Sequence, residues 1–172
     1  MKWKDKLLKQ LIVSLKQDNE WKGYVTKLEE DISAVGVHLA VFTEPILSAL
    51  LTGAKTVESR FSLNKIQPFG RVCTGDIILV KKSGGPVVAV FISGEIKSYS
   101  NLTPERIDQI RSKYSEPLGM SEDDAFWVEK KDSKYATLIN IKRVKRLDPC
   151  RIDKKDRTSW VILAQREIDR LL

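Results

Sequence analysis

Cysteine and histidine are scarce in this sequence, which contains only Cys73, Cys150 and His38. The two cysteines are too far apart to form a zinc-ligand pair, and no second histidine stands near His38. We therefore expect no metal site, no cofactor and a structural role for His38 beside a strand. Reduced thiols are typical of reducing compartments, so we expect a cytoplasmic protein.

Long apolar runs are also missing, because no stretch approaches the ~18 residues that a membrane-spanning helix needs. The basic start at Met1–Lys6 is not followed by an unbroken apolar segment, so it does not predict a secretory signal. We therefore expect no membrane partner. The apolar share of 42% and the charged share of 31% are typical of one globular domain, with or without an extension.

Nucleotide-binding and catalytic signatures are absent as well. The sequence contains no GxxxxGK[ST] loop, no GxGxxG loop and no histidine-based triad. One glycine-rich stretch, Ser83–Pro86, is not followed by a helix start, and we interpret it as a hairpin turn. ATP hydrolysis and dinucleotide-dependent chemistry are therefore not expected.

Positive charge is concentrated in one segment. Residues 130–157 contain eleven Lys and Arg against four Asp and Glu, while the remainder carries 19 of each sign. The whole formal net charge of +7 thus comes from this segment. Such a concentration is typical of a surface that binds a polyanion, and the alternative is a basic face that only aids solubility.

Residues 1–36 predict two amphipathic helices, Met1–Gln17 and Glu20–Ile32. Their apolar side chains recur at helical spacing and include Trp3, Leu7, Leu11, Trp21 and Leu28. Two such helices cannot bury their apolar stripes against each other alone. We expect this N-terminal helical extension to dock on the following domain, residues 37–172, or to form a homodimer.

Residues 37–172 predict a small mixed β-barrel with helices packed outside, an α+β fold. The predicted strands are the one that follows Gly53 and the segments Val37–Phe42, Ile77–Lys81, Val87–Ile96, Tyr135–Arg146 and Ser159–Ala164. The regular β–α alternation of a doubly wound sheet is absent. Gly94 inside a strand predicts a bulge or a close backbone approach.

A short charged stretch, Gly53–Phe61, follows a predicted apolar helix and begins a strand. Alternate side chains of a strand share a face, so Thr56, Glu58 and Arg60 lie together. Lys55 stands at the corner between helix and strand. This density of charge in a small domain needs either a ligand or an internal ion pair to satisfy it.

The spacing Gly-x-Lys-x-x-Glu-x-Arg, formed here by Gly53, Lys55, Glu58 and Arg60, resembles the signature of the ASCH domain, a member of the PUA-like superfamily. The resemblance extends over residues 38–160 and takes in the segments Gly75–Val80, Val87–Ile96 and Tyr135–Arg146. It implies a PUA-like barrel with a cleft at one end and favours nucleic-acid binding.

We interpret the charged stretch as a site for nucleic acid, RNA in particular, or for a modified nucleoside. Glu58 can accept hydrogen bonds from a base edge, while Lys55 and Arg60 can hold phosphate or carbonyl oxygens. The other candidates are Thr56, Lys81 on a neighbouring strand, Trp127 as a stacking platform, and Lys142, Arg143, Lys145 and Arg146 as nucleic-acid contacts. Two alternatives stay open: a Glu58–Arg60 pair that closes the barrel end, and core packing of Trp127.

The resemblance also implies an alternative function, because some ASCH proteins are ribonucleases and others are amidohydrolases that remove acetyl from 4-acetylcytidine. The amidohydrolase type carries a lysine followed three residues later by a threonine nucleophile. Here that position is Glu58, so the nucleophile role cannot be transferred. Lys55 and Glu58 are the candidates for a catalytic role, with Glu58 as a general base.

Overall fold

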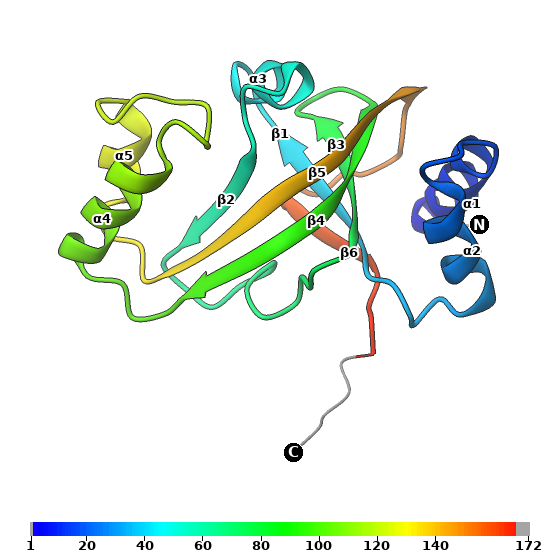
Figure 1. The fold of residues 1–172 in the computed structure, drawn as a ribbon, viewed down its shortest axis with the longest axis horizontal. Coiled ribbons are helices and arrows are strands. Elements are labelled where there is room, and N and C mark those ends of the chain that lie inside the picture. Colours follow the sequence, from blue (N-terminus) through cyan, green and yellow to red (C-terminus); the bar gives the residue numbers. More distant parts are fainter. Residues whose placement is uncertain (1, 168–172) are drawn as a thin grey trace.

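The computed structural model describes residues 2–167, which form five helices and six strands (Figure 1). The helices are α1 (Trp3–Leu15), α2 (Lys22–Glu30), α3 (Ile46–Thr52), α4 (Pro104–Tyr114) and α5 (Ala125–Lys130). The strands are β1 (Val37–Phe42), β2 (Val57–Ser62), β3 (Ile77–Lys82), β4 (Val87–Tyr99), β5 (Tyr135–Cys150) and β6 (Trp160–Ala164). The α+β class predicted from the sequence is confirmed.

All six strands form a single curled sheet in the order β2-β5-β4-β3-β1-β6. β1 and β3 are parallel, and every other neighbouring pair is antiparallel, so the sheet is mixed as predicted. β2 and β6 lie at its two edges, and the sheet curls into a half-barrel (Figure 1). None of the helices in residues 2–167 is both long and apolar enough to span a membrane.

The two N-terminal helices pack on one face of the sheet, beside β3 and β4 (Figure 1). Their predicted apolar stripes are the buried faces: Leu7, Leu11, Trp21 and Leu28 are each at most 4% exposed. These side chains share one core with sheet residues such as Leu79. The docking alternative is therefore confirmed, and the stripes are not available for the homodimer that the sequence also allowed.

Two further cores fill the rest of the molecule. One lies inside the curl of the sheet and joins α3 to β1, β3 and β4 through residues such as Leu50, Ile78 and Phe91. The other lies under α4 and α5, at the end of the sheet opposite α1 (Figure 1). β1 is buried along nearly its whole length because apolar layers cover both of its faces.

His38 has the structural role expected of it. It is completely buried, its Nε2 lies 3.0 Å from Asp76 Oδ2, and Trp160 Nε1 donates to its Nδ1 at 3.1 Å. Because Nδ1 accepts, the neutral ring carries its proton on Nε2 and donates it to Asp76. Burial alone would raise the pKa of Asp76, but hydrogen bonds from His38 and the Cys73 amide, with the charge of Arg166, lower it below the usual value.

The element boundaries differ from the prediction mainly at β5. The expected strand ended at Arg146, but β5 continues through Pro149 to Cys150, which pairs with Val87 on β4. Proline is tolerated there because it lies next to the strand end. The bulge predicted at Gly94 is confirmed, because the β4–β5 register shifts there and a Cβ on Gly94 would lie 2.8 Å from Lys142 Cε.

Candidate functional site

Lys55 is held at the corner between α3 and β2. Gly53 ends α3 in the left-handed conformation with φ of 83°, as expected of a helix C-cap glycine. The amide of Thr56 then donates to Pro117 O at 2.8 Å, which ties the corner to the loop before α5. In that loop, Gly119 approaches so closely that a Cβ would lie 3.3 Å from Lys55 Cβ. The position of Lys55 is thus fixed by its backbone and by its neighbours.

Lys55, Glu58 and Arg60 form one charged cluster, with Glu58 in the centre. Lys55 Nζ lies 3.2 Å from Glu58 Oε2, and Arg60 Nε donates to Glu58 Oε1 at 2.7 Å. Lys55 Nζ also donates to Leu118 O at 3.2 Å. Lys55 and Glu58 are only 3% and 4% exposed. Among the described residues, two of the three ammonium hydrogens of Lys55 have partners, which leaves one donor for a ligand.

Arg60 joins the two edges of the curled sheet. Its Nη2 donates to Val41 O of β1 at 3.1 Å, and its Nη1 donates to Ser159 O, directly before β6, at 3.4 Å. The guanidinium also lies over the rings of Phe42 and Trp160, with centroids at 5.1 and 5.4 Å. Arg60 therefore has the bracing role that was the structural alternative for the Glu58–Arg60 pair, and it binds across the gap between β2 and β6.

A cavity of about 390 Å³ opens beside this cluster. Its charged lining consists of Lys55, Glu58, Arg60, Glu129 and Lys130, and its apolar walls of Val41, Phe42, Ile46, Phe61, Met120 and Phe126. Thr43, Ser59 and Ser159 complete the lining. Aromatic walls around a few convergent polar groups are typical of small-molecule sites, and the volume lies in the usual range for them.

Three of the other predicted site residues lie elsewhere. Thr56 is exposed at the corner and does not line this cavity. The prediction for Lys81 is wrong. Lys81 lies opposite Val41 of the cavity wall, but it is not among the described lining, and it lies near the cations Lys154 and Arg151. The prediction that Trp127 stacks on a base is also wrong, because Trp127 is 4% exposed and packs in the core against Phe61.

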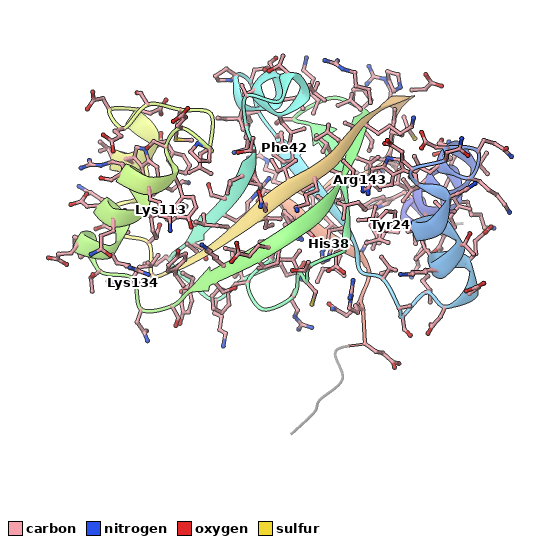
Figure 2. All side chains as sticks on the ribbon, viewed as in Figure 1. Tyr24, His38, Phe42, Lys113, Lys134 and Arg143 are labelled. Carbon is pink, nitrogen blue, oxygen red and sulfur yellow. The ribbon has the colours of Figure 1, made fainter. Side chains whose placement is uncertain are left out.

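Phe126 takes the place predicted for Trp127. It lines the cavity, and its ring lies edge-on to Phe61 with centroids 5.8 Å apart. Lys130 lies over the ring of Phe126 at 5.3 Å. Phe42, at the end of β1 beneath α3 in Figure 2, forms another wall. Neither Phe42 nor Phe126 was predicted as a site residue. A helix as short as α5 has no apolar periodicity that would show which of its aromatic side chains faces the cavity.

The basic residues of β5 lie apart from this cavity. Lys142, Arg143 and Arg146 are exposed, whereas Lys145 is partly buried and forms an ion pair of 2.7 Å with Asp18 before α2. None of these four residues is among the described lining of the cavity. Figure 2 shows Arg143 on the part of β5 that extends toward α1 and α2. The predicted basic strand therefore exists, but part of its charge holds the N-terminal extension.

Comparison with solved structures identifies this architecture. The crystal structure of ASCH from Zymomonas mobilis superposes with a TM-score of 0.57 over 73% of this chain and 86% of that chain, at 12% sequence identity. The crystal structure of a mutant of the same protein gives a TM-score of 0.58 over 73% of this chain and 87% of that chain, also at 12% identity. The chain has an ASCH fold. No protein-family model matches the chain, and neither does any curated protein.

The ASCH fold agrees with what the spacing of Gly53, Lys55, Glu58 and Arg60 suggested. The predicted mixed barrel is found as a six-stranded sheet that curls into a half-barrel. At 12% identity the likeness concerns the fold alone. The chemistry of the site therefore has to be argued from the side chains of this chain. Among residues 2–167 there is no group of three His, Cys, Asp or Glu side chains arranged to hold a metal ion.

Proposed function

We propose that this ASCH fold binds RNA by taking one nucleobase, or a modified nucleoside, into the cavity beside Lys55. The observation that carries the proposal is a nucleoside-sized cavity with aromatic walls and a fixed Lys55–Glu58 pair. Single-stranded RNA is recognised by stacking unpaired bases on aromatic side chains and by hydrogen bonds to base edges. Phe42 and Phe126 supply the walls for such a base.

The charged pair suits the edge of a base. The remaining ammonium hydrogen of Lys55 can donate to a carbonyl oxygen or a ring nitrogen. Each carboxylate oxygen of Glu58 interacts with one cation, Oε2 with Lys55 and Oε1 with Arg60. Each oxygen keeps a lone pair that can accept a hydrogen bond from an exocyclic amino group of a base. A donor and an acceptor side by side match the amide-like edges of bases. Their rigid placement by Arg60 and Leu118 lowers the entropic cost of binding.

Replacing Lys55 by methionine is expected to weaken nucleoside binding about 10- to 100-fold, since a hydrogen bond from a charged group contributes about 1.5–3 kcal/mol. The measurement is calorimetric titration with cytidine, uridine, adenosine, guanosine and 4-acetylcytidine. Lys27→Met, on the exposed face of α2, is the matched control and should leave every affinity unchanged. Equal affinities of wild type and Lys55→Met would contradict the proposed site.

The same solutions test the alternative of hydrolysis. Release of acetate from 4-acetylcytidine, or shortening of an RNA probe, would show that the cavity is an active site. The lysine, the carboxylate and the three hydroxyl groups that line it would then be the candidates for the reaction. Binding without turnover supports a recognition module, which is the function that we propose.

We also propose that the exposed basic residues of β5 contact the RNA backbone, which makes binding salt-dependent. Reversal of Lys142, Arg143 and Arg146 to glutamate should remove about three phosphate contacts. The slope of log affinity against log salt for single-stranded oligouridine should then fall by about 2. Lys145 is left intact because its change would also break the ion pair with Asp18.

The control for this charge reversal changes the net charge equally, but on helices that pack against the other end of β5. Glutamate at Arg106, Lys113 and Lys131, which lie on α4 and directly after α5, provides it. If both triple variants lose affinity alike, the effect is one of total charge, and the exposed basic residues of β5 only aid solubility.

A further inference from the structure

A second cavity, of about 640 Å³, lies beside the proposed base site. It is bounded by the loop after β2 and by the chain entering β6, and the residues that matter for its chemistry are Lys65, Phe69, Arg71, Ser159 and Trp160. Ser159 lines both cavities. In Figure 1 the connection from β2 to β3 lies at the lower edge of the sheet, whereas α3 lies at the upper edge.

The wall between the two cavities is thin and well defined. Arg60 lines the first cavity and lies 5.4 Å from the ring of Trp160, which lines the second. Arg60 also donates to Ser159 O. A chain that leaves the first cavity over Ser159 therefore enters the second directly, without crossing another element of the fold.

The second cavity has the chemistry of a nucleotide site. Lys65 and Arg71 are exposed and form no ion pair with any residue in 2–167, and no Asp or Glu is among the described lining. Phe69 is half-buried, with Lys65 over its ring at 5.6 Å and Tyr135 edge-on at 5.1 Å. Two uncompensated cations beside a supported aromatic ring provide phosphate contacts and a stacking surface.

The loop that carries these residues is folded by its own backbone. Phe69 N donates to Ile66 O at 3.0 Å, and Arg71 N donates to Pro68 O at 2.9 Å. Leu63 and Ile66 in the same loop are 62% and 59% exposed, so the apolar surface continues beyond the cavity. The loop thus presents Lys65, Phe69 and Arg71 without first having to become ordered, which favours binding.

We infer that the ligand of the base site is part of a strand, not a free nucleoside, and that the neighbouring nucleotide binds in the cavity of Lys65, Phe69 and Arg71. Lys65 and Arg71 bind the phosphate between the two nucleotides, and the base of the neighbour contacts Phe69. This inference rests on the proposed function of the first cavity and names its substrate class as an oligonucleotide.

The test compares free nucleosides with trinucleotides that carry the same nucleoside between two uridines. Wild type should bind the best trinucleotide at least about tenfold more tightly than the matching nucleoside, because two phosphate contacts are added. Lys65→Ala/Arg71→Ala should lose this gain while binding the nucleoside as wild type does. Arg106→Ala/Lys113→Ala on α4 is the matched control and should keep the gain.

The possible results separate the two proposals. If the nucleoside binds but the trinucleotide binds no more tightly, or if the double variant keeps the gain, the second cavity is not a nucleotide subsite. If Lys55→Met binds the trinucleotide as wild type does and Lys65→Ala/Arg71→Ala does not, the second cavity binds RNA and the base site is wrong. If neither probe binds wild type, both proposals are overturned.

Discussion

Replacing Glu58 by glutamine is expected to lower the free energy of unfolding by about 3–5 kcal/mol, because it leaves a buried lysine without its counter-charge. Lys55 and Glu58 are almost completely buried, and Glu58 is the carboxylate between Lys55 and Arg60. For a chain of this length, the melting temperature should fall by about 6–20 °C.

Glu129→Gln is the matched control for this change. Glu129 lines the same cavity but is exposed on α5, so its replacement should alter the free energy of unfolding by no more than about 0.5 kcal/mol. The double variant Lys55→Met/Glu58→Gln should recover part of the loss, since it removes both buried charges. Thermal melts of the four proteins provide the measurement, and equal melting temperatures for the two glutamine variants would contradict the buried ion pair.

Deletion of residues 2–34 is expected to cause aggregation or unfolding. Residues 2–34 bury seven large apolar side chains, Leu7, Leu8, Leu11, Leu15, Trp21, Val25 and Leu28. Each contributes about 1.5–3 kcal/mol by burial, and the sheet face beneath them would be exposed as one apolar patch. Light scattering and a thermal melt measure the effect. A truncated chain that stays monomeric and melts at the wild-type temperature would contradict the shared core.

A pair of point variants tests the same interface where the deletion cannot be purified. Leu11 is 3% exposed and Val13, on the opposite face of α1, is 74% exposed. Leu11→Ala should cost about 2–5 kcal/mol and Val13→Ala less than about 0.5 kcal/mol. Equal effects of the two substitutions would show that α1 is not packed on the sheet through this face.

Local sequence patterns predicted much of this molecule. The period-two alternation of a strand places Glu58 and Arg60 on one face, and the structure has them 2.7 Å apart. Gly53 predicted the end of α3, and the helical spacing of Leu7 and Leu11 predicted a buried stripe. These features depend on neighbours within a few residues, so they can be predicted without knowing the topology.

Features that depend on strand order could not be predicted in this way. Lys81 was placed beside the motif because β3 follows β2 in the chain, but β3 pairs with β4 and β1 in the sheet, and Lys81 lies near Arg151 and Lys154. The contacts of Arg60 with Val41 and Ser159 exist because the curl brings β2 near β1 and β6. The sequence also allowed α1 and α2 either to dock on the sheet or to dimerise. An apolar stripe shows that a helix face is buried, but it does not show which surface covers that face.

The most direct test of the central claim is a crystal structure of the protein soaked with the nucleoside or trinucleotide that binds most tightly. We expect one base in the 390 Å³ cavity, within hydrogen-bonding distance of Lys55 Nζ and Glu58 and against the ring of Phe42 or Phe126. A base bound at another surface while this cavity stays unoccupied at saturating concentration would contradict the account.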